Sequence, residues 1–146
     1  MPTYNGEKYL VEQIESILQQ RDINYRLVIM DDCSTDKTFT NLQSYSDRIE
    51  IFKEKKNVGT TKTLLKMLQH YKDEDYVAFC DQDDVWLPAK LTVGISSIEL
   101  NLDTRNLTPV LYGGKTIYVD EDLRVLGTSF EFNYPKIFRN ALVQSM

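Results

Sequence analysis

Four consecutive residues, Asp81-Gln82-Asp83-Asp84, place three carboxylates directly after the apolar run Tyr76-Val77-Ala78-Phe79-Cys80. Like charges at the end of a buried strand repel one another and lose solvation, which is costly unless something compensates. A divalent cation is the usual compensation, because Mg²⁺ and Mn²⁺ take hard oxygen ligands and are completed by substrate phosphates. The motif therefore predicts a metal ion together with a phosphorylated ligand. A solvated acidic turn that caps the helix after Pro88 is the alternative.

Composition and residue spacing argue against several other kinds of site and protein. A calcium loop of the EF-hand type does not fit, because Val85 occupies the position where its third acidic ligand or asparagine is needed. A net charge of -5 and a pI near 4.9 argue against a nucleic-acid-binding surface, which is basic. Cys33 and Cys80 lack metal-site spacing and favour a reduced, cytoplasmic setting. No apolar stretch is long enough for a membrane helix, and the N-terminus lacks the features of a signal peptide.

The elements that must position the acids alternate along the chain. Apolar residues at helical spacing predict four helices. The first has an apolar face of Leu10, Val11, Ile14, Ile17 and Leu18, with Asn5 as an upstream cap, and a short second helix with Phe39 and Leu42 follows the candidate caps Ser34, Thr35 and Asp36. The third and fourth have faces of Leu64, Leu65, Leu68 and Tyr71, and of Leu91, Ile95, Ile98 and Leu102. Short apolar runs predict strands at 27–30, 49–52, 76–80, 110–112 and 116–119, and residues 57–59 and 120–122 are predicted to be turns.

Strand-helix alternation over 146 residues predicts one α/β domain with a largely parallel sheet. Ligands bind such sheets beyond the carboxyl ends of the strands. The polar candidates follow successive predicted strands: residues 3–5, the pair Asp31 and Asp32, and residues 81–84. One site at one edge of the sheet explains this placement better than scattered solvation does.

These pieces in this order resemble family 2 glycosyltransferases with the GT-A fold, a Rossmann-like sheet flanked by helices. The matching residues are Met1-Pro2-Thr3-Tyr4-Asn5-Gly6, Ile29-Met30-Asp31-Asp32-Cys33-Ser34-Thr35-Asp36, Asn57-Val58-Gly59, Phe79-Cys80-Asp81-Gln82-Asp83-Asp84-Val85-Trp86-Leu87-Pro88 and Lys90-Leu91. The similarity is greatest to the bacterial rhamnosyltransferase-like subgroup, which builds surface polysaccharide.

The resemblance implies a role for each matching residue. The nucleotide-binding residues would be Pro2, Thr3, Tyr4, Asn5, Asp32, Asn57, Gly59, Lys62 and Asp81. Asp32 would accept a hydrogen bond from N3–H of uracil or thymine. Asp83 and Asp81 would hold Mg²⁺ or Mn²⁺, and Asp84 and Trp86 would border the sugar pocket.

Each of these roles has a structural alternative. Asp31 and Asp32 could cap a helix, Gly59 could be a plain turn glycine, Lys62 could be solvated and Trp86 could belong to the core. His70 is predicted to lie at the surface.

The same resemblance implies a sugar transfer from a UDP- or dTDP-sugar to a saccharide or lipid-linked acceptor, with no nucleic-acid partner. It places the protein in the cytoplasm and leaves room for peripheral association of a full-length protein with the inner membrane face. Family members have more residues before Pro2, so the first strand is expected to be mostly missing.

Residues 138–144 resemble the approach to the acceptor half, so the chain is expected to be truncated at both ends and inactive alone. Residues 1–100 would be the nucleotide-binding half and 101–146 the start of the acceptor half, with the catalytic base downstream of Met146. A non-catalytic nucleotide- and metal-binding fragment is one alternative. A phosphoacceptor signalling domain is the other, suggested by Asp31, Asp32 and Lys115, but it leaves residues 81–84 unexplained.

Overall fold

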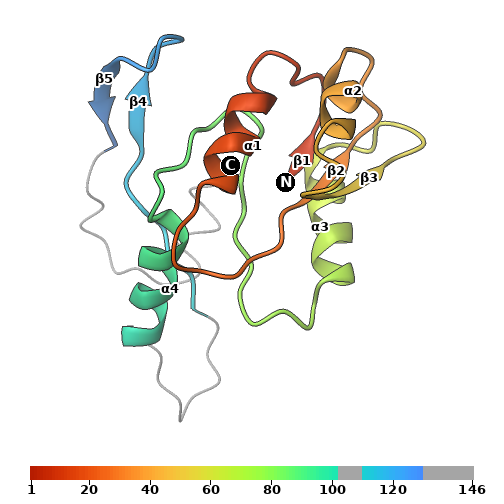
Figure 1. Cartoon of the computed structure of the whole chain (residues 1–146). Helices are drawn as coiled ribbons and strands as arrows, with labels where there is room; N and C mark the ends of the chain where they lie inside the picture. Colours follow the sequence, from red (N-terminus) through yellow and green to blue (C-terminus); the bar gives the residue numbers. More distant parts are fainter. Residues whose placement is uncertain (102–109, 130–146) are drawn as a thin grey trace. The chain divides into compact units, whose positions relative to one another are not determined.

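The computed structural model describes residues 1–101 and 110–129. Its elements follow the chain in the order β1 (Pro2–Thr3), α1 (Leu10–Leu18), β2 (Val28–Asp31), α2 (Thr38–Gln43), β3 (Glu50–Lys53), α3 (Thr60–His70), α4 (Lys90–Asn101), β4 (Ile117–Val119) and β5 (Val125–Thr128) (Figure 1). The chain divides into two compact units, Met1–Thr92 and Val93–Met146. The functional halves expected on either side of residue 100 stay a prediction.

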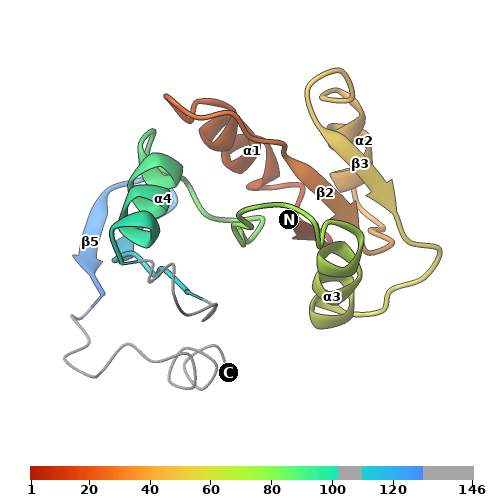
Figure 2. The ribbon, with the colours of Figure 1, turned by 90° about the horizontal axis from the view of Figure 1, so that it is seen from below.

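The first unit contains a parallel sheet with the strand order β1-β2-β3. Thr3 pairs with Asp31, and Asp31 pairs with Lys53, so the three strands end at the same edge. Helices α1 and α2 contact each other, whereas α3 contacts β1, and Figure 2 shows α3 across the strands from the other two helices. The predicted parallel α/β arrangement is confirmed, and its carboxyl edge is where the polar candidates gather.

The core of this unit forms where the apolar face of α1 meets the sheet. Leu10, Ile14 and Ile29 are fully buried, and Leu42 of α2 closes the same cluster. These residues follow the helical and strand spacing of the sequence, because one face of each element must leave water. Val11 was expected on the apolar face of α1 but is 44% exposed.

The predicted strand at 76–80 is wrong: this segment is extended but belongs to no sheet among the described residues. Tyr76, Val77 and Phe79 are exposed, and only Cys80 is buried. One reason is that β1, an edge strand of this sheet, spans only two residues, and Pro2 has no N–H to donate. A neighbouring strand finds few backbone groups to pair with there.

The second unit, in its described part, contains a β4–β5 hairpin and most of α4. Ile117 pairs with Thr128, and the turn at 120–122 is confirmed because Asp120 accepts the backbone N–H groups of Asp122 and Arg124. The predicted strand at 110–112 is wrong, since these three exposed residues join no ladder. Leu102 and residues 138–144 lie outside the described part of the chain.

Asn5 does not cap α1, in contrast to the prediction. Tyr9 precedes the helix without a side-chain cap, and the Asn5 side chain instead accepts the N–H of Thr35 at 2.9 Å. Within the described residues, no helix combines the length and apolar character needed to cross a membrane.

Candidate functional site

Asp32 stands at the centre of the carboxyl edge, one residue beyond β2, and is 2% exposed. Its two carboxylate oxygens accept the backbone N–H groups of Val58 at 2.8 Å and Gly59 at 2.7 Å. Its own N–H donates to the carbonyl of Thr3 at 2.8 Å. The buried charge is therefore satisfied by backbone donors, and each oxygen keeps lone pairs for a further donor.

Gly59 is needed for conformation as well as for this contact. It lies at the N-terminus of α3 with φ +88, a left-handed value that side chains rarely adopt. The Asn57-Val58-Gly59 segment is thus held against Asp32 while it starts α3. The turn-glycine alternative fits Gly59. A place of this loop beside the nucleotide stays a prediction.

Asp31 orders the loop that follows β2. It is fully buried, and its carboxylate accepts the N–H of Ser34 at 3.1 Å and the Ser34 hydroxyl at 2.5 Å. The hydroxyl of Thr3 also approaches it at 3.5 Å. Asp31 therefore has a local structural role, as its capping alternative proposed, although it fastens a loop and not a helix end.

The loop after β1 and the loop after β2 are joined by side-chain bonds to backbone. Asn5 donates its N–H to the Ser34 hydroxyl at 3.0 Å, and Gly6 donates to the Thr38 hydroxyl at 2.8 Å. A reciprocal pair follows, in which Asp36 accepts from Glu7 N–H at 3.1 Å and the Glu7 carboxylate accepts from Lys37 N–H at 2.8 Å. We call residues 4–7 and 34–38 the paired loops. Their bonds connect the loop after β1 to the loop that follows Asp31 and Asp32 in the chain.

Each paired loop has a residue with left-handed backbone conformation near or just before its start. Asn5 has φ +49, and Cys33, just before the second loop, has φ +65. Such conformations are uncommon outside glycine and persist where surrounding bonds fix them. Here the fixing bonds are the ones that join the two loops.

The acidic segment 81–84 is attached to the first of these loops. The Gln82 side chain accepts the N–H of Tyr4 at 2.9 Å and donates to the carbonyl of Tyr4 at 3.1 Å. Asp81, Asp83 and Asp84 are exposed on either side of it. The structure therefore joins the acids, the paired loops and Asp32 through consecutive residues, Thr3 and Tyr4.

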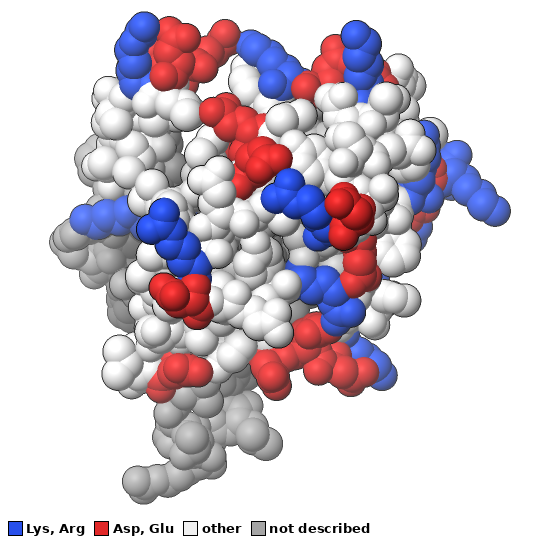
Figure 3. Space-filling view, viewed as in Figure 1, with Lys and Arg blue, Asp and Glu red and all other residues white. Residues whose placement is uncertain are grey.

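The acidic segment is electrostatically crowded. Partial burial, followed by repulsion from Asp81 and Asp83, raises the pKa of the Asp84 carboxyl, and Lys90 opposes the shift. On the face shown in Figure 3, acidic and basic side chains are interspersed. Hard oxygen donors that repel one another fit a divalent cation, which their crowding favours.

No group of three or more His, Cys, Asp or Glu side chains among the described residues is arranged to hold a metal by itself. A magnesium-type site uses one or two carboxylates and takes its other ligands from water and substrate phosphates.

Trp86 is 6% exposed and packs in the core, which matches the core alternative considered from the sequence. The backbone N–H of Trp86 donates to the hydroxyl of Ser16 at 2.9 Å, and the Lys90 ammonium lies 4.9 Å from the centre of the Trp86 ring. Gln20, just after α1, also donates to the carbonyl of Leu87 at 2.8 Å. The C-terminal part of α1 therefore fixes the segment that follows the acids. A contact of Trp86 with a sugar stays a prediction.

The remaining candidates are peripheral. Lys62 is exposed on α3, Asn57 is exposed in its loop, and His70 is exposed as predicted. Burial raises the pKa of the Cys80 thiol, which therefore remains protonated and unreactive at neutral pH.

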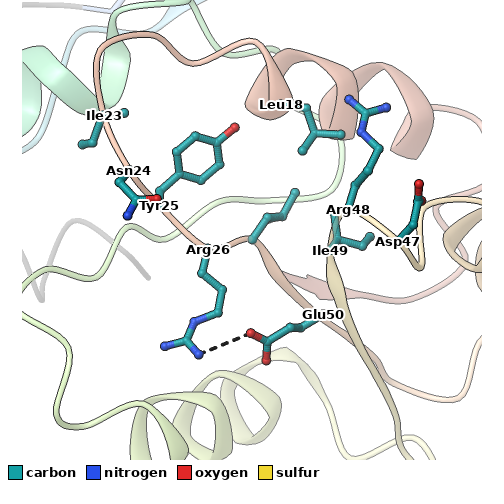
Figure 4. A pocket seen from close by; sticks show the side chains of 10 residues that line it. Leu18, Ile23, Asn24, Tyr25, Arg26, Asp47, Arg48, Ile49 and Glu50 are labelled. Atoms are coloured by element: carbon teal, nitrogen blue, oxygen red, sulfur yellow. Dashed lines mark ion pairs between the residues drawn. The ribbon is translucent and has the colours of Figure 1, made fainter.

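An open hollow lies at the opposite ends of the strands. It is lined by residues 23–27, which precede β2, and 47–50, which precede and begin β3, and an ion pair joins Arg26 to Glu50 beside it at 3.3 Å (Figure 4). Because ligand sites of parallel sheets lie at the carboxyl ends, this hollow is separate from the candidate site.

From the sequence, no role was assigned to Gln82, Gly6 and Ser16, and Ser34 was considered only as a helix cap. Their types are common in loops and helices, and only the fold shows their partners. The one available signal was the position of Gln82 between two carboxylates.

Comparison with known proteins agrees with this arrangement. Residues 1–131 match the family model described as Glycosyl transferase family 2. The chain is 35% identical over 108 residues to the dTDP-rhamnosyl transferase RfbG of Shigella flexneri, covering 69% of this chain and 37% of that protein. It is 35% identical to the UDP-Glc:alpha-D-GlcNAc-diphosphoundecaprenol beta-1,3-glucosyltransferase WfgD of Escherichia coli, covering 69% and 40% respectively. The chain thus spans less than half the length of these relatives.

Solved structures show the same fold. A crystal structure of S. aureus TarS superposes with a TM-score of 0.60 at 30% identity, covering 68% of this chain and 18% of that one. The structure of TarS residues 1–349 in complex with UDP-GlcNAc gives a TM-score of 0.61 at 24% identity over 78% of this chain and 37% of that one. The expected GT-A fold is confirmed.

Proposed function

Because this chain belongs to glycosyl transferase family 2, we propose that it supplies the donor-binding part of an enzyme that transfers a sugar from a UDP- or dTDP-sugar to an acceptor hydroxyl. The observation that carries the proposal is that hydrogen bonds through Thr3 and Tyr4 connect Asp32, the paired loops and the acidic segment. The named activities of RfbG and WfgD support a pyrimidine nucleoside diphosphate as the donor carrier.

The nucleotide would lie along the carboxyl edge of the sheet. Pro2, Thr3, Tyr4 and Asn5 would line the base and ribose, with Tyr4 as the exposed member of the group. Asp32 would accept N3–H of the base with a lone pair that Val58 and Gly59 leave unused. Asn57, Gly59 and Lys62 would flank the nucleotide from the start of α3.

Asp83, with Asp81, would hold Mg²⁺ or Mn²⁺ beside the diphosphate. When bound, such an ion supplies neutralisation of the negative charge that develops on the leaving diphosphate. The chain's own contribution is to hold two carboxylates together at one edge of the sheet, where Gln82 fixes their segment to Tyr4. Asp84 and Trp86 would border the sugar.

The acceptor hydroxyl must lose a proton to a positioned carboxylate. In the described part of the second unit, Asp120 and Asp122 are bound to Arg124 in the exposed hairpin turn, so they are poor candidates for this base. A saccharide or lipid-linked acceptor in bacterial surface polysaccharide synthesis is proposed, with the protein in the cytoplasm near the membrane face.

Calorimetry with UDP, dTDP and CDP, each with Mn²⁺ and with EDTA, tests this function. UDP and dTDP should bind more tightly with Mn²⁺, and CDP should bind more weakly than both. Cytosine presents an acceptor at N3, and facing it with a buried carboxylate leaves two groups unpaired at a cost of ~1–3 kcal/mol. Equal binding with Mn²⁺ and EDTA would refute the metal role, and equal binding of CDP and UDP would refute the role of Asp32.

A further inference from the structure

Gln82 makes an unusual contact for a residue between two proposed metal ligands. Its side-chain amide exchanges two hydrogen bonds with the backbone of Tyr4, 78 residues away in the sequence. The N–H of Tyr4 can only donate and its carbonyl can only accept, so the orientation of the Gln82 amide is fixed. The pair reproduces the two-bond exchange of neighbouring strands, although residues 76–80 form no strand.

Gly6 makes room for this contact. A Cβ atom built at Gly6 would lie 2.4 Å from Oε1 and 2.6 Å from Cδ of Gln82, closer than any real contact. Gly6 is buried, and its φ is not left-handed, so close approach and not backbone conformation explains the glycine. Gly6 and Gln82 therefore pack directly against each other. We call the three residues Gln82, Tyr4 and Gly6 the Gln82 clasp.

The clasp connects two parts of the site, the acidic segment 81–84 and the paired loops. On one side, Gln82 is covalently joined to Asp81 and Asp83. On the other, the loop of Tyr4 is bonded to Ser34 and Thr38 through its next two residues. Gln82 carries no charge and is half-buried, so it adds nothing directly to the attraction for a cation or a phosphate.

We propose that Gln82 is a positioning residue, which holds Asp81 and Asp83 at a fixed place relative to the nucleotide-binding loop so that cation and nucleotide bind together. This inference rests on the proposed function. It predicts a loss of affinity confined to the metal-dependent part of nucleotide binding, because the clasp sets where the carboxylates lie and not whether the base is recognised.

The test compares Gln82→Ala and Gln82→Met with the unchanged chain. Methionine keeps the volume against Gly6 but makes neither hydrogen bond. Both variants should bind UDP about tenfold more weakly in Mn²⁺, since two hydrogen bonds of ordinary strength are lost. Binding in EDTA should be unchanged. Gln69→Ala, the same truncation on the exposed surface of α3, is the matched control and should bind as the unchanged chain does.

A double-mutant cycle adds a second measurement. Gly6→Ala should displace Gln82 and reproduce the metal-dependent loss, whereas adding Gly6→Ala to Gln82→Ala should cost little more. Backbone amide exchange should also become faster at Tyr4 in Gln82→Met, and stay slow at Val58 and Gly59, which are bonded to Asp32.

The outcomes are distinguishable. If the unchanged chain binds UDP better with Mn²⁺ and Gln82→Met binds equally well, the positioning role is refuted and the proposed function stands. Equal losses in Mn²⁺ and EDTA would also refute it, since they indicate general damage. If the unchanged chain binds no nucleotide, the proposed function fails and the inference falls with it.

Discussion

At the residue scale, Asp83 is the side chain whose removal should separate cation binding from nucleotide binding. Its segment holds three carboxylates in four residues. Burial, and then repulsion from Asp81 and Asp83, raise the pKa of Asp84, and a cation relieves that repulsion. We expect Asp83→Ala to bind UDP with about the same affinity in Mn²⁺ as in EDTA, because a cation that it no longer binds cannot strengthen nucleotide binding. Calorimetry measures both arms. Asp73→Asn is the control, and a Mn²⁺ effect that persists in Asp83→Ala would assign the cation to another ligand.

Asp32 supports a second expectation, about stability. Its two oxygens hold the N–H groups of Val58 and Gly59, and an asparagine would turn an NH₂ group toward one of these donors. Leaving a buried donor unsatisfied costs about 1–3 kcal/mol. Asp32→Asn should therefore lower the free energy of unfolding by about that amount in urea titrations. Asp47→Asn, at an exposed position, should leave it unchanged. If the free energy of unfolding of Asp32→Asn equals that of the unchanged chain, these hydrogen bonds contribute nothing to stability.

The predictability of the site also differs from residue to residue. Asp81, Asp83 and Asp32 could be proposed because charge after an apolar run demands compensation, whether or not that run forms a strand. Gln82 could not, since its role depends on a partner 78 residues away. Gly6 likewise looks like an ordinary loop glycine until the side chain packed against it is known.

At the element scale, helix and strand predictions failed for different reasons. The local spacing of apolar residues places α1 and α3 along the chain. It does not fix every residue of their faces, because Val11 and Leu65, expected on the apolar faces, are 44% and 54% exposed, and the buried residues of α3 are Thr63 and Met67. The segment 76–80 has strand-like residues, but a strand also needs a partner, and pairing is a property of the whole sheet. Asn5 suits a helix cap by type, yet the neighbouring loop provides the better partner, Thr35.

The junction of α3 with β3 allows a prediction about pH. Tyr71, at the end of α3, donates its hydroxyl to Glu50 of β3 at 2.7 Å. Burial, and then this bond, raise the pKa of Tyr71 from 10.0 to about 12. The folded state therefore keeps a proton that the unfolded state releases. The stabilisation is fully present below pH 10 and is lost as pH rises toward 12.

Tyr71→Phe should accordingly lower the free energy of unfolding by roughly 1 kcal/mol at neutral pH. The free energy of unfolding of Tyr71→Phe should decline less steeply between pH 10 and 12 than that of the unchanged chain. Thermal unfolding across this range measures both effects. Tyr118→Phe, which removes a hydroxyl from an exposed strand residue, is the control. Parallel declines for Tyr71→Phe and the unchanged chain would contradict the assignment.

At the scale of the whole molecule, donor binding and sugar transfer make different demands. The groups proposed for the donor all belong to the first unit, Met1–Thr92. Transfer also needs a carboxylate base and a pocket that orients the acceptor. In the described part of the second unit, Asp120 and Asp122 of the hairpin turn form ion pairs with Arg124, which makes these two acids poor candidates for the base.

We therefore expect the 146-residue chain to bind UDP or dTDP without transferring sugar. A general base contributes on the order of 10²–10⁴ to the rate, and an acceptor pocket supplies the orientation that makes the attack effectively intramolecular, so transfer requires both. The measurement follows release of UDP or dTDP from donor sugars in the presence of saccharide acceptors, alongside calorimetric binding of the same donors. Asp83→Ala serves as the control for any release observed. Acceptor-dependent release by the unchanged chain, abolished in Asp83→Ala, would show that the base lies within these residues and that donor and acceptor sites are both complete.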